Sequence, residues 1–137
     1  MHTKPCLNHD DVVAILNAAR TEAQKNSWAV SIAVVDDGGH LLGQYRLDGA
    51  PAMSARMCVA KARTSALGKR ETKVYEDIIN NGRTAFLSAP DLDGMLEGGV
   101  PILVGGQLAG AVGVSGVKSV EDAQIAKAGI AAVVPQA

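Results

Sequence analysis

The stretch EGGVPILVGGQLAGAVGVSG (Glu97–Gly116) decides how this chain folds, because its many glycines admit several interpretations. Two short apolar runs, VPILV and QLAGAVGVS, are separated by the pair Gly105-Gly106. Two apolar runs that are joined by a two-residue glycine connection are typical of a β-hairpin. We therefore predict a hairpin here.

The spacing of the same residues excludes two other interpretations. A phosphate-binding loop needs Lys followed by Ser or Thr after its glycines, and a dinucleotide fingerprint needs G-x-G-x-x-G directly before a helix. The stretch contains neither pattern. A nucleophile elbow needs glycine two residues after its serine, whereas Val117 stands at that place after Ser115. The sequence thus predicts neither a nucleotide site nor a serine hydrolase.

The last predicted strand has one bulky face and one nearly bare face, because successive side chains point to opposite sides of a strand. The small residues that share one face are Ala109, Ala111, Gly113 and Ser115. The residues of the other face are Leu108, Gly110, Val112 and Val114. A bare face lets a helix or a flat ligand lie close to the backbone. We expect the alanine-rich C-terminal helix to pack there, with a flat ligand as the alternative.

The rest of the chain repeats the hairpin and surrounds it with helices. Residues 28–47 read as a first hairpin, with Asp36 to Gly39 at its turn. Helical spacing and capping residues predict helices at 7–26, 52–67, 69–82 and 119–134. Residues 83–98 are rich in turn residues and are expected to carry a short strand and a loop. This order predicts one α+β domain over residues 1–137, with an antiparallel sheet of about five strands flanked by helices.

Composition restricts the class of protein. Hydrophobic residues make up 47% of the 137 residues, charged residues 20%, and the formal net charge is −1. These values are typical of a soluble globular domain and give no basic excess for nucleic acid or an anionic membrane. No apolar run is long enough for a membrane helix and the N-terminus lacks a secretory signal, so we expect a cytoplasmic protein. Cys6 and Cys58 form no disulfide framework or metal-binding pattern.

The predicted helix 52–67 has an unusual distribution of charge. Ser54, Lys61 and Ser65 form a narrow polar stripe, and Arg56 and Arg63 lie on the opposite side within apolar surroundings. Arginine suits bidentate recognition of a carboxylate. The two arginines either anchor an anionic ligand at a pocket or subunit interface, or cover apolar surface while their charged ends reach solvent or an acidic partner.

His40 is the candidate metal ligand. It follows two glycines at the turn of the first predicted hairpin, where an accessible imidazole could coordinate a metal or haem iron. The alternative is an ordinary surface histidine. Arg46, Lys61 and Ser115 are further ligand-binding candidates by position and chemistry. No set of base, nucleophile and metal ligands can be recognised, so catalytic residues stay unassigned and the sequence leaves open whether the chain is an enzyme.

Several separated blocks resemble one known family. SIAVVDDGGHLLGQYRLDGAP, KARTS, GGVPILVGGQLAGAVGVSG and EDAQIAKAG occur in the order typical of the GlcG/HbpS family, also called the haem-degrading domain family. The resemblance extends over residues 7–134. It implies a profilin-like α-β-α fold, assembly into homo-oligomers and, as in some members, haem binding. Other members are encoded beside glycolate, glycerol or propanediol metabolism, and the missing export signal places this chain with the intracellular branch.

The resemblance and the residues together give a functional hypothesis. The chain is interpreted as an intracellular, homo-oligomeric GlcG-like protein that binds a small anionic or planar ligand, with haem as the leading cofactor. The residues expected to bind the ligand are His40 (the candidate iron ligand), Arg46, Arg56, Lys61, Arg63 and Ser115. One alternative is an enzyme that acts on a small hydroxy or oxo acid. The other is an accessory protein for glycerol or diol metabolism. No nucleic-acid or membrane partner is expected.

Overall fold

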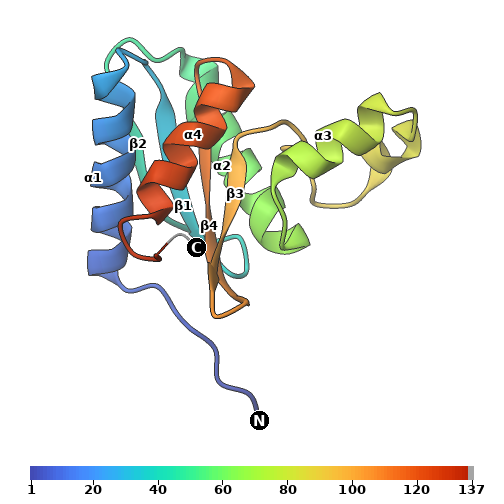
Figure 1. Cartoon of the computed structure of the whole chain (residues 1–137). Helices are drawn as coiled ribbons and strands as arrows, with labels where there is room; N and C mark the ends of the chain where they lie inside the picture. Colours follow the sequence, from blue (N-terminus) through green and yellow to red (C-terminus); the bar gives the residue numbers. More distant parts are fainter. Residues whose placement is uncertain (136–137) are drawn as a thin grey trace.

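The computed structural model describes residues 1–135 and has the predicted order of elements. These are α1 (His9–Lys25), β1 (Ser31–Asp36), β2 (Leu41–Arg46), α2 (Ala52–Gly68), α3 (Thr72–Asn80), the 3-10 helix η1 (Thr84–Ser88), β3 (Gly99–Val104), β4 (Gln107–Ser115) and α4 (Ser119–Ile130). The strands form one antiparallel sheet in the order β2-β1-β4-β3, so the two predicted hairpins join through β1 and β4 (Figure 1). Within these residues, no helix has the length and apolar character needed to cross a membrane.

The sheet has four strands within residues 1–135, and the expectation of about five was wrong. The short strand expected within residues 83–98 is absent, since Thr84–Ser88 is a 3-10 helix and a loop leads on to β3. Pro90 cannot donate a hydrogen bond to a sheet ladder, and Asp91 has a φ of 63°, which breaks an extended path. The segment instead lies away from the edge of the sheet (Figure 1).

Helices α1 and α4 cover the bulky face of the sheet. Asn8 caps α1 by accepting a hydrogen bond from the N–H of Asp11, as its side chain predicts. The buried residues of α1 recur at helical spacing and form one apolar stripe: Val12, Ile15, Leu16, Ala19 and Ala23. It packs with the large residues of the sheet and of α4, among them Ile32, Val34, Ile102, Val112, Val114 and Ile125. This cluster is the main core of the molecule.

Helix α2 alone covers the bare face of the sheet. The residues between them are small: Ala33, Val35, Cys58, Ala62, Ala66 and Ala111. A Cβ on Gly113 would lie 2.0 Å from the carbonyl oxygen of Cys58, so glycine lets the helix approach the strand backbone. The expectation that the C-terminal helix packs on this face was wrong. The small residues of α4 serve its approach to α1 instead, because a Cβ on Gly129 would lie 3.1 Å from Ala19 Cβ.

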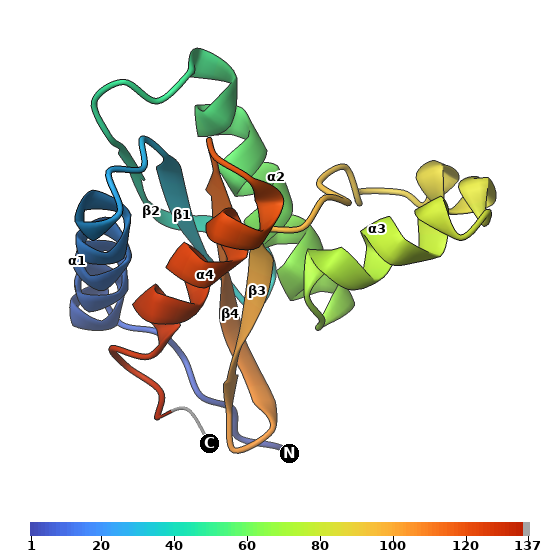
Figure 2. The ribbon, with the colours of Figure 1, turned by 45° about the horizontal axis from the view of Figure 1, so that its top comes forward.

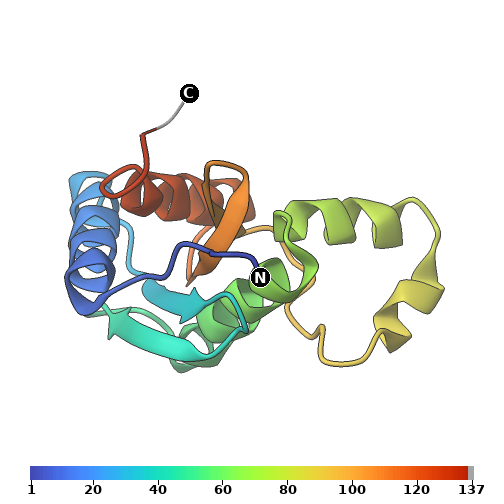
Figure 3. The same ribbon diagram turned by 90° about the horizontal axis from the view of Figure 1, so that it is seen from below.

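Residues 72–98 form an arm that projects from the body of the domain, as three views show (Figures 1, 2 and 3). The arm is attached at its base by Thr72, whose hydroxyl oxygen accepts a hydrogen bond from the N–H of Gly99 at 2.8 Å. Within the arm, the rings of Tyr75 and Phe86 pack with their centroids 5.3 Å apart and hold α3 against η1. The arm therefore has its own small apolar contact, apart from the main core.

Candidate ligand-binding sites

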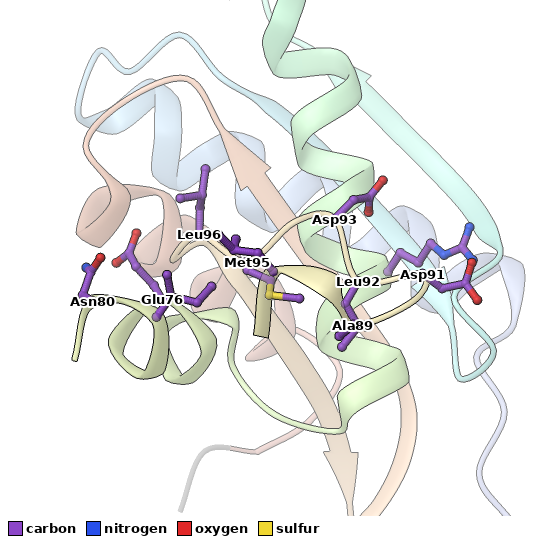
Figure 4. A pocket seen from close by; sticks show the side chains of 11 residues that line it. Glu76, Asn80, Ala89, Asp91, Leu92, Asp93, Met95 and Leu96 are labelled. Carbon is purple, nitrogen blue, oxygen red and sulfur yellow. The ribbon is translucent and has the colours of Figure 1, made fainter. Parts of the chain in front are cut away.

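The arm encloses a cavity of about 600 Å³ between α3, η1 and the loop that follows. Its apolar walls come from Ile79, Leu87, Leu92, Met95 and Leu96. Glu76 and Asn80 of α3 lie at one side of the close-up view and Asp91 and Asp93 of the loop at the other (Figure 4). A cavity of this size with apolar walls and a few polar groups is typical of small-molecule sites.

Arg63 is the one cation among the residues that line this arm cavity. Its guanidinium lies 3.5 Å from the Asp91 carboxylate, and the two side chains are 45% and 73% exposed. Exposed ion pairs of this kind contribute little to stability, so Arg63 can exchange Asp91 for another carboxylate at small cost. Glu76 and Asp93 add two further carboxylates to the lining. A ligand with one carboxylate at Arg63 therefore suits the cavity better than a small polyanion.

The structure brings two of the predicted site residues, His40 and Arg63, to the same end of α2. A Cβ on Gly39 would lie 3.0 Å from Cγ of Arg63, so the hairpin turn rests on the stem of this arginine. The N–H of His40 donates to the Asp36 carboxylate at 2.9 Å, which fixes the backbone of the turn. The exposed imidazole of His40 has no hydrogen-bond partner within residues 1–135. His40 does not line the arm cavity itself.

Arg46 and Arg56 lie apart from the other candidates. The guanidinium of Arg46 donates to the carbonyl oxygen of Ala50 at 3.3 and 3.1 Å, and so fastens the connection between β2 and α2. Arg56 is exposed and has no ion-pair partner in the described part of the chain. The six predicted residues thus do not form one site.

Lys61 and Ser115 meet in a second, smaller space, a cleft of about 250 Å³ between α2, the end of β4 and the start of α4. Lys61 is only 3% exposed. Its ammonium lies 3.1 Å from Oδ2 of Asp122 and donates to the carbonyl oxygen of Val114 at 3.0 Å. Burial raises the pKa of Asp122 to about 6, although the attraction of Lys61 acts in the opposite direction.

Asp122 and Ser54 line this cleft and were missed by the sequence reasoning. Asp122 had an ordinary explanation as an acidic residue in the first turn of a helix. The signal that could have found it is the polar stripe of α2, which faces the protein interior rather than solvent. A lysine on a buried stripe requires a carboxylate partner, and an acidic residue at the start of the last helix supplies it. The other missed residue, Ser54, has a hydroxyl that forms a hydrogen bond with the hydroxyl of Ser31 at 2.8 Å.

Metal and thiol chemistry have little basis in the part of the chain that is described. Residues 1–135 contain no group of three or more His, Cys, Asp or Glu side chains that could hold a metal ion. Both cysteines are free, Cys6 exposed and Cys58 buried. Burial raises the pKa of the Cys58 thiol to about 11, so little reactive thiolate forms near neutral pH.

A four-stranded antiparallel sheet with α1 and α4 on one face, α2 on the other and an arm that lines a cavity defines a small α+β domain. The family model described as "Haem degrading protein HbpS-like" matches residues 7–131, and the chain belongs to this family. The predicted family is thereby confirmed.

Three relatives illustrate the similarity. Protein GlcG of Escherichia coli K12 is 57% identical over 115 residues, which are 84% of this chain and 85% of that protein. A double mutant of HbpS from Streptomyces reticuli has a TM-score of 0.86 at 28% identity, covering 97% of this chain and 90% of the other. The PduOC:heme complex has a TM-score of 0.83 at 26% identity, covering 93% of this chain and 95% of the other.

Proposed function

We propose that this protein binds a planar, largely apolar ligand that carries a carboxylate, with haem as the leading candidate. The observation that carries the proposal is the arm cavity of about 600 Å³, whose apolar walls are joined at one edge by Arg63. Its volume lies in the usual range for small-molecule sites. The description of the matched family and the haem complex of PduOC give independent support for haem.

The lining of the arm cavity fits part of a haem group. Leu87, Leu92 and Met95 offer apolar contacts, and Arg63 is placed to hold a propionate. No His, Cys or Tyr lines the cavity, so the imidazole of an axial histidine would have to come from the neighbouring turn, where His40 has no other partner within residues 1–135. We therefore assign Arg63 to the carboxylate and His40 to the iron.

A titration with two ligands tests these roles separately. The purified protein is titrated with haem and with iron-free protoporphyrin IX, and absorbance is followed for the unmodified chain, His40→Ala, Arg63→Ala and Arg56→Ala. Arg56 is a matched control, because it is an exposed arginine on the same helix that does not line the cavity. We expect His40→Ala to weaken haem binding alone. Arg63→Ala should weaken the binding of both ligands by about tenfold, as loss of a charged hydrogen bond predicts, and Arg56→Ala should change neither.

Two outcomes would count against this function. Absence of a saturable absorbance change would exclude both haem and protoporphyrin IX as ligands. Saturable binding that is indifferent to Arg63→Ala would place the ligand outside the arm cavity. Binding that requires Arg63 but is unaffected by His40→Ala would retain the cavity and remove His40 as the iron ligand.

We also propose that the protein works as a cytoplasmic homo-oligomer. This is supported by large apolar side chains on the arm and on the neighbouring start of α2 that the single chain leaves in solvent: Met53, Val74, Leu87 and Leu96. Contiguous exposed apolar surface commonly marks a protein–protein contact. Light scattering at increasing protein concentration tests the proposal, and a monomeric mass at high concentration would contradict it.

A further inference from the structure

The small cleft between α2, β4 and α4 contains hydrogen-bond donors that the protein itself does not use. The ammonium of Lys61 has three protons, and two of them are directed to Val114 and Asp122. The third has no acceptor within residues 1–135. The hydroxyl of Ser115 has no partner there either, although Ser115 is only 6% exposed. No fully buried side-chain donor of residues 1–135 lacks a partner, so the unpaired hydroxyl of Ser115 keeps some exposure at the cleft that it lines, where a ligand can reach it.

The start of α4 adds to the same side of the cleft. Ser119 is the first residue of this 12-residue helix, and its N–H has no acceptor among residues 1–135. Free N–H groups and the helix dipole favour an anion at a helix N-terminus. The nearby carboxylate of Asp122 accepts hydrogen bonds from Lys61 and from the N–H of Val117. Within residues 1–135 it accepts none from Ser115 or from the N–H of Ser119.

We propose that this cleft binds the carboxylate of a small monocarboxylic acid. The carboxylate accepts hydrogen bonds from the hydroxyl of Ser115 and from the free proton of Lys61. The short apolar tail of the acid contacts Met53, Met57 and Leu96, which line the other side of the cleft. This cleft shares Leu96 with the lining of the arm cavity, but its hydrogen-bond donors, Lys61 and Ser115, do not line that cavity, and the proposal does not depend on the binding of a planar ligand.

Size and charge favour a monocarboxylate over an inorganic oxyanion. The volume of about 250 Å³ is roughly that of eight water molecules at about 30 Å³ each, which suits an acid of a few carbon atoms. Asp122 already offsets the charge of Lys61, so the cleft is less suited to a dianion such as hydrogen phosphate than to a monoanion held by hydrogen bonds. The thioether side chains of Met53 and Met57 are adaptable apolar contacts for a tail but offer nothing to a phosphate oxygen.

The test is an NMR titration of the full chain with three probes at constant ionic strength: propionate, its neutral analogue propionamide, and inorganic phosphate. We expect propionate at millimolar concentrations to shift the backbone amides of residues 115–120 saturably, and the other two probes to bind more weakly. Ser115→Ala removes one donor and should raise the dissociation constant for propionate about tenfold. Ser88→Ala, in the exposed η1, is the matched control and should leave it unchanged.

The proposal is overturned if propionate gives no saturable shift, or if propionamide or phosphate binds as tightly as propionate. Equal affinity in Ser115→Ala and the unmodified chain would overturn it as well. Both serine variants remove a single hydroxyl, so both are expected to fold, and thermal unfolding of each verifies this. The Arg63→Ala variant separates this proposal from the one for the planar ligand. It should weaken binding of the planar ligand and leave the propionate shift unchanged.

Discussion

The two faces of the sheet and the projecting arm differ in what holds them. The core residues on both faces are packed between helix and sheet, and Gly99 of β3 and Gly113 of β4 leave no room for a larger side chain under α2. The arm is attached at its base by Thr72 and by the hydrogen bond from the N–H of Gly94 to Thr64, whereas further out it has one ring–ring contact and several large apolar side chains in solvent. Tight packing determines the body of the domain, whereas the arm has surface left for a ligand or a second chain.

The largest effect is expected where packing is tightest. In Gly113→Val, the new Cβ would lie 2.0 Å from the Cys58 carbonyl oxygen and 2.5 Å from the Ala62 nitrogen, both backbone atoms that cannot move without α2. We expect a loss of about 4–5 kcal/mol in the free energy of unfolding, or failure to fold, as for severe overpacking. Chemical denaturation followed by circular dichroism measures the change.

Gly38→Ala is the control for this substitution. Its Cβ would lie 3.2 Å from the exposed side chain of His40, which can rotate away, and 3.4 Å from the Asp36 carboxylate, which is an ordinary van der Waals contact. We expect a change of about 1 kcal/mol or less. If Gly113→Val folded with normal stability, α2 would not lie on the backbone of β4 as the structure has it.

The next effect comes from the ion pair that links α2 to α4. Lys61→Met leaves the carboxylate of Asp122 buried and without its cation, because Asp122 is only 2% exposed. Breaking one half of a buried pair costs about 3–4 kcal/mol, and we expect a loss of that size in the free energy of unfolding. The double variant Lys61→Met, Asp122→Leu should recover much of it, since no charge is left buried. A double variant that is no more stable than Lys61→Met would contradict this account.

A smaller effect should follow from pH. Burial raises the pKa of Asp122 from 3.8 to about 6, so the folded chain binds a proton more tightly at this group than the unfolded chain does. The contribution of Asp122 to stability is therefore full below pH 4 and is lost as the pH rises through 6, by at most about 3 kcal/mol. Glu22 and Asp37 act in the opposite sense at lower pH, because hydrogen bonds hold their pKa values below the ordinary range.

Unfolding measured between pH 4 and 7 for the unmodified chain and for Asp122→Asn isolates the Asp122 contribution. The difference in free energy of unfolding between the two proteins should vary with pH across this window. The contributions of Glu22 and Asp37 are common to both proteins and cancel in the comparison. A difference that is constant with pH would show that Asp122 titrates at its ordinary pKa.

Most of the body of the domain could be predicted from sequence, because its local signals agree with its packing. Asn8 caps α1, the apolar stripe of that helix is the buried one, and Gly105-Gly106 turns the second hairpin. Which helix covers the bare face could not be predicted, since α2 and α4 are both rich in small residues. The burial of the polar stripe of α2 could not be predicted from local pattern either. Lys61 is buried against Asp122, which lies 61 residues further along the chain.

The candidate sites were harder to predict than the fold. The sequence identified Lys61, Ser115, Arg63 and His40, but it could not divide them between two spaces. Nothing in the local pattern of residues 83–98 indicates that they close a cavity against α3. That outcome depends on side-chain contacts between elements, such as the one between Tyr75 of α3 and Phe86 of η1, which no periodicity reveals.

The smallest effect on stability is expected in the arm, together with a clear effect on binding. Leu87 lies in η1, lines the arm cavity and is 66% exposed. Leu87→Ser should therefore change the free energy of unfolding by no more than about 0.5 kcal/mol, as for most surface substitutions. It should nevertheless weaken the binding of protoporphyrin IX and reduce the oligomeric mass in light scattering. The reason is that the ligand and a second copy of the chain would both contact this apolar surface.

Val13→Ser is the matched control for Leu87→Ser, because Val13 is an exposed apolar residue of α1, on the body of the domain. It should leave stability, ligand affinity and mass all unchanged. If Leu87→Ser destabilised the chain as strongly as a core substitution, the arm would belong to the same packed unit as the sheet. If it changed neither binding nor mass, the apolar surface of the arm would have no use in solution. Only a change in binding or mass without a change in stability supports the distinction between a tightly packed body and an arm that holds the functional surface.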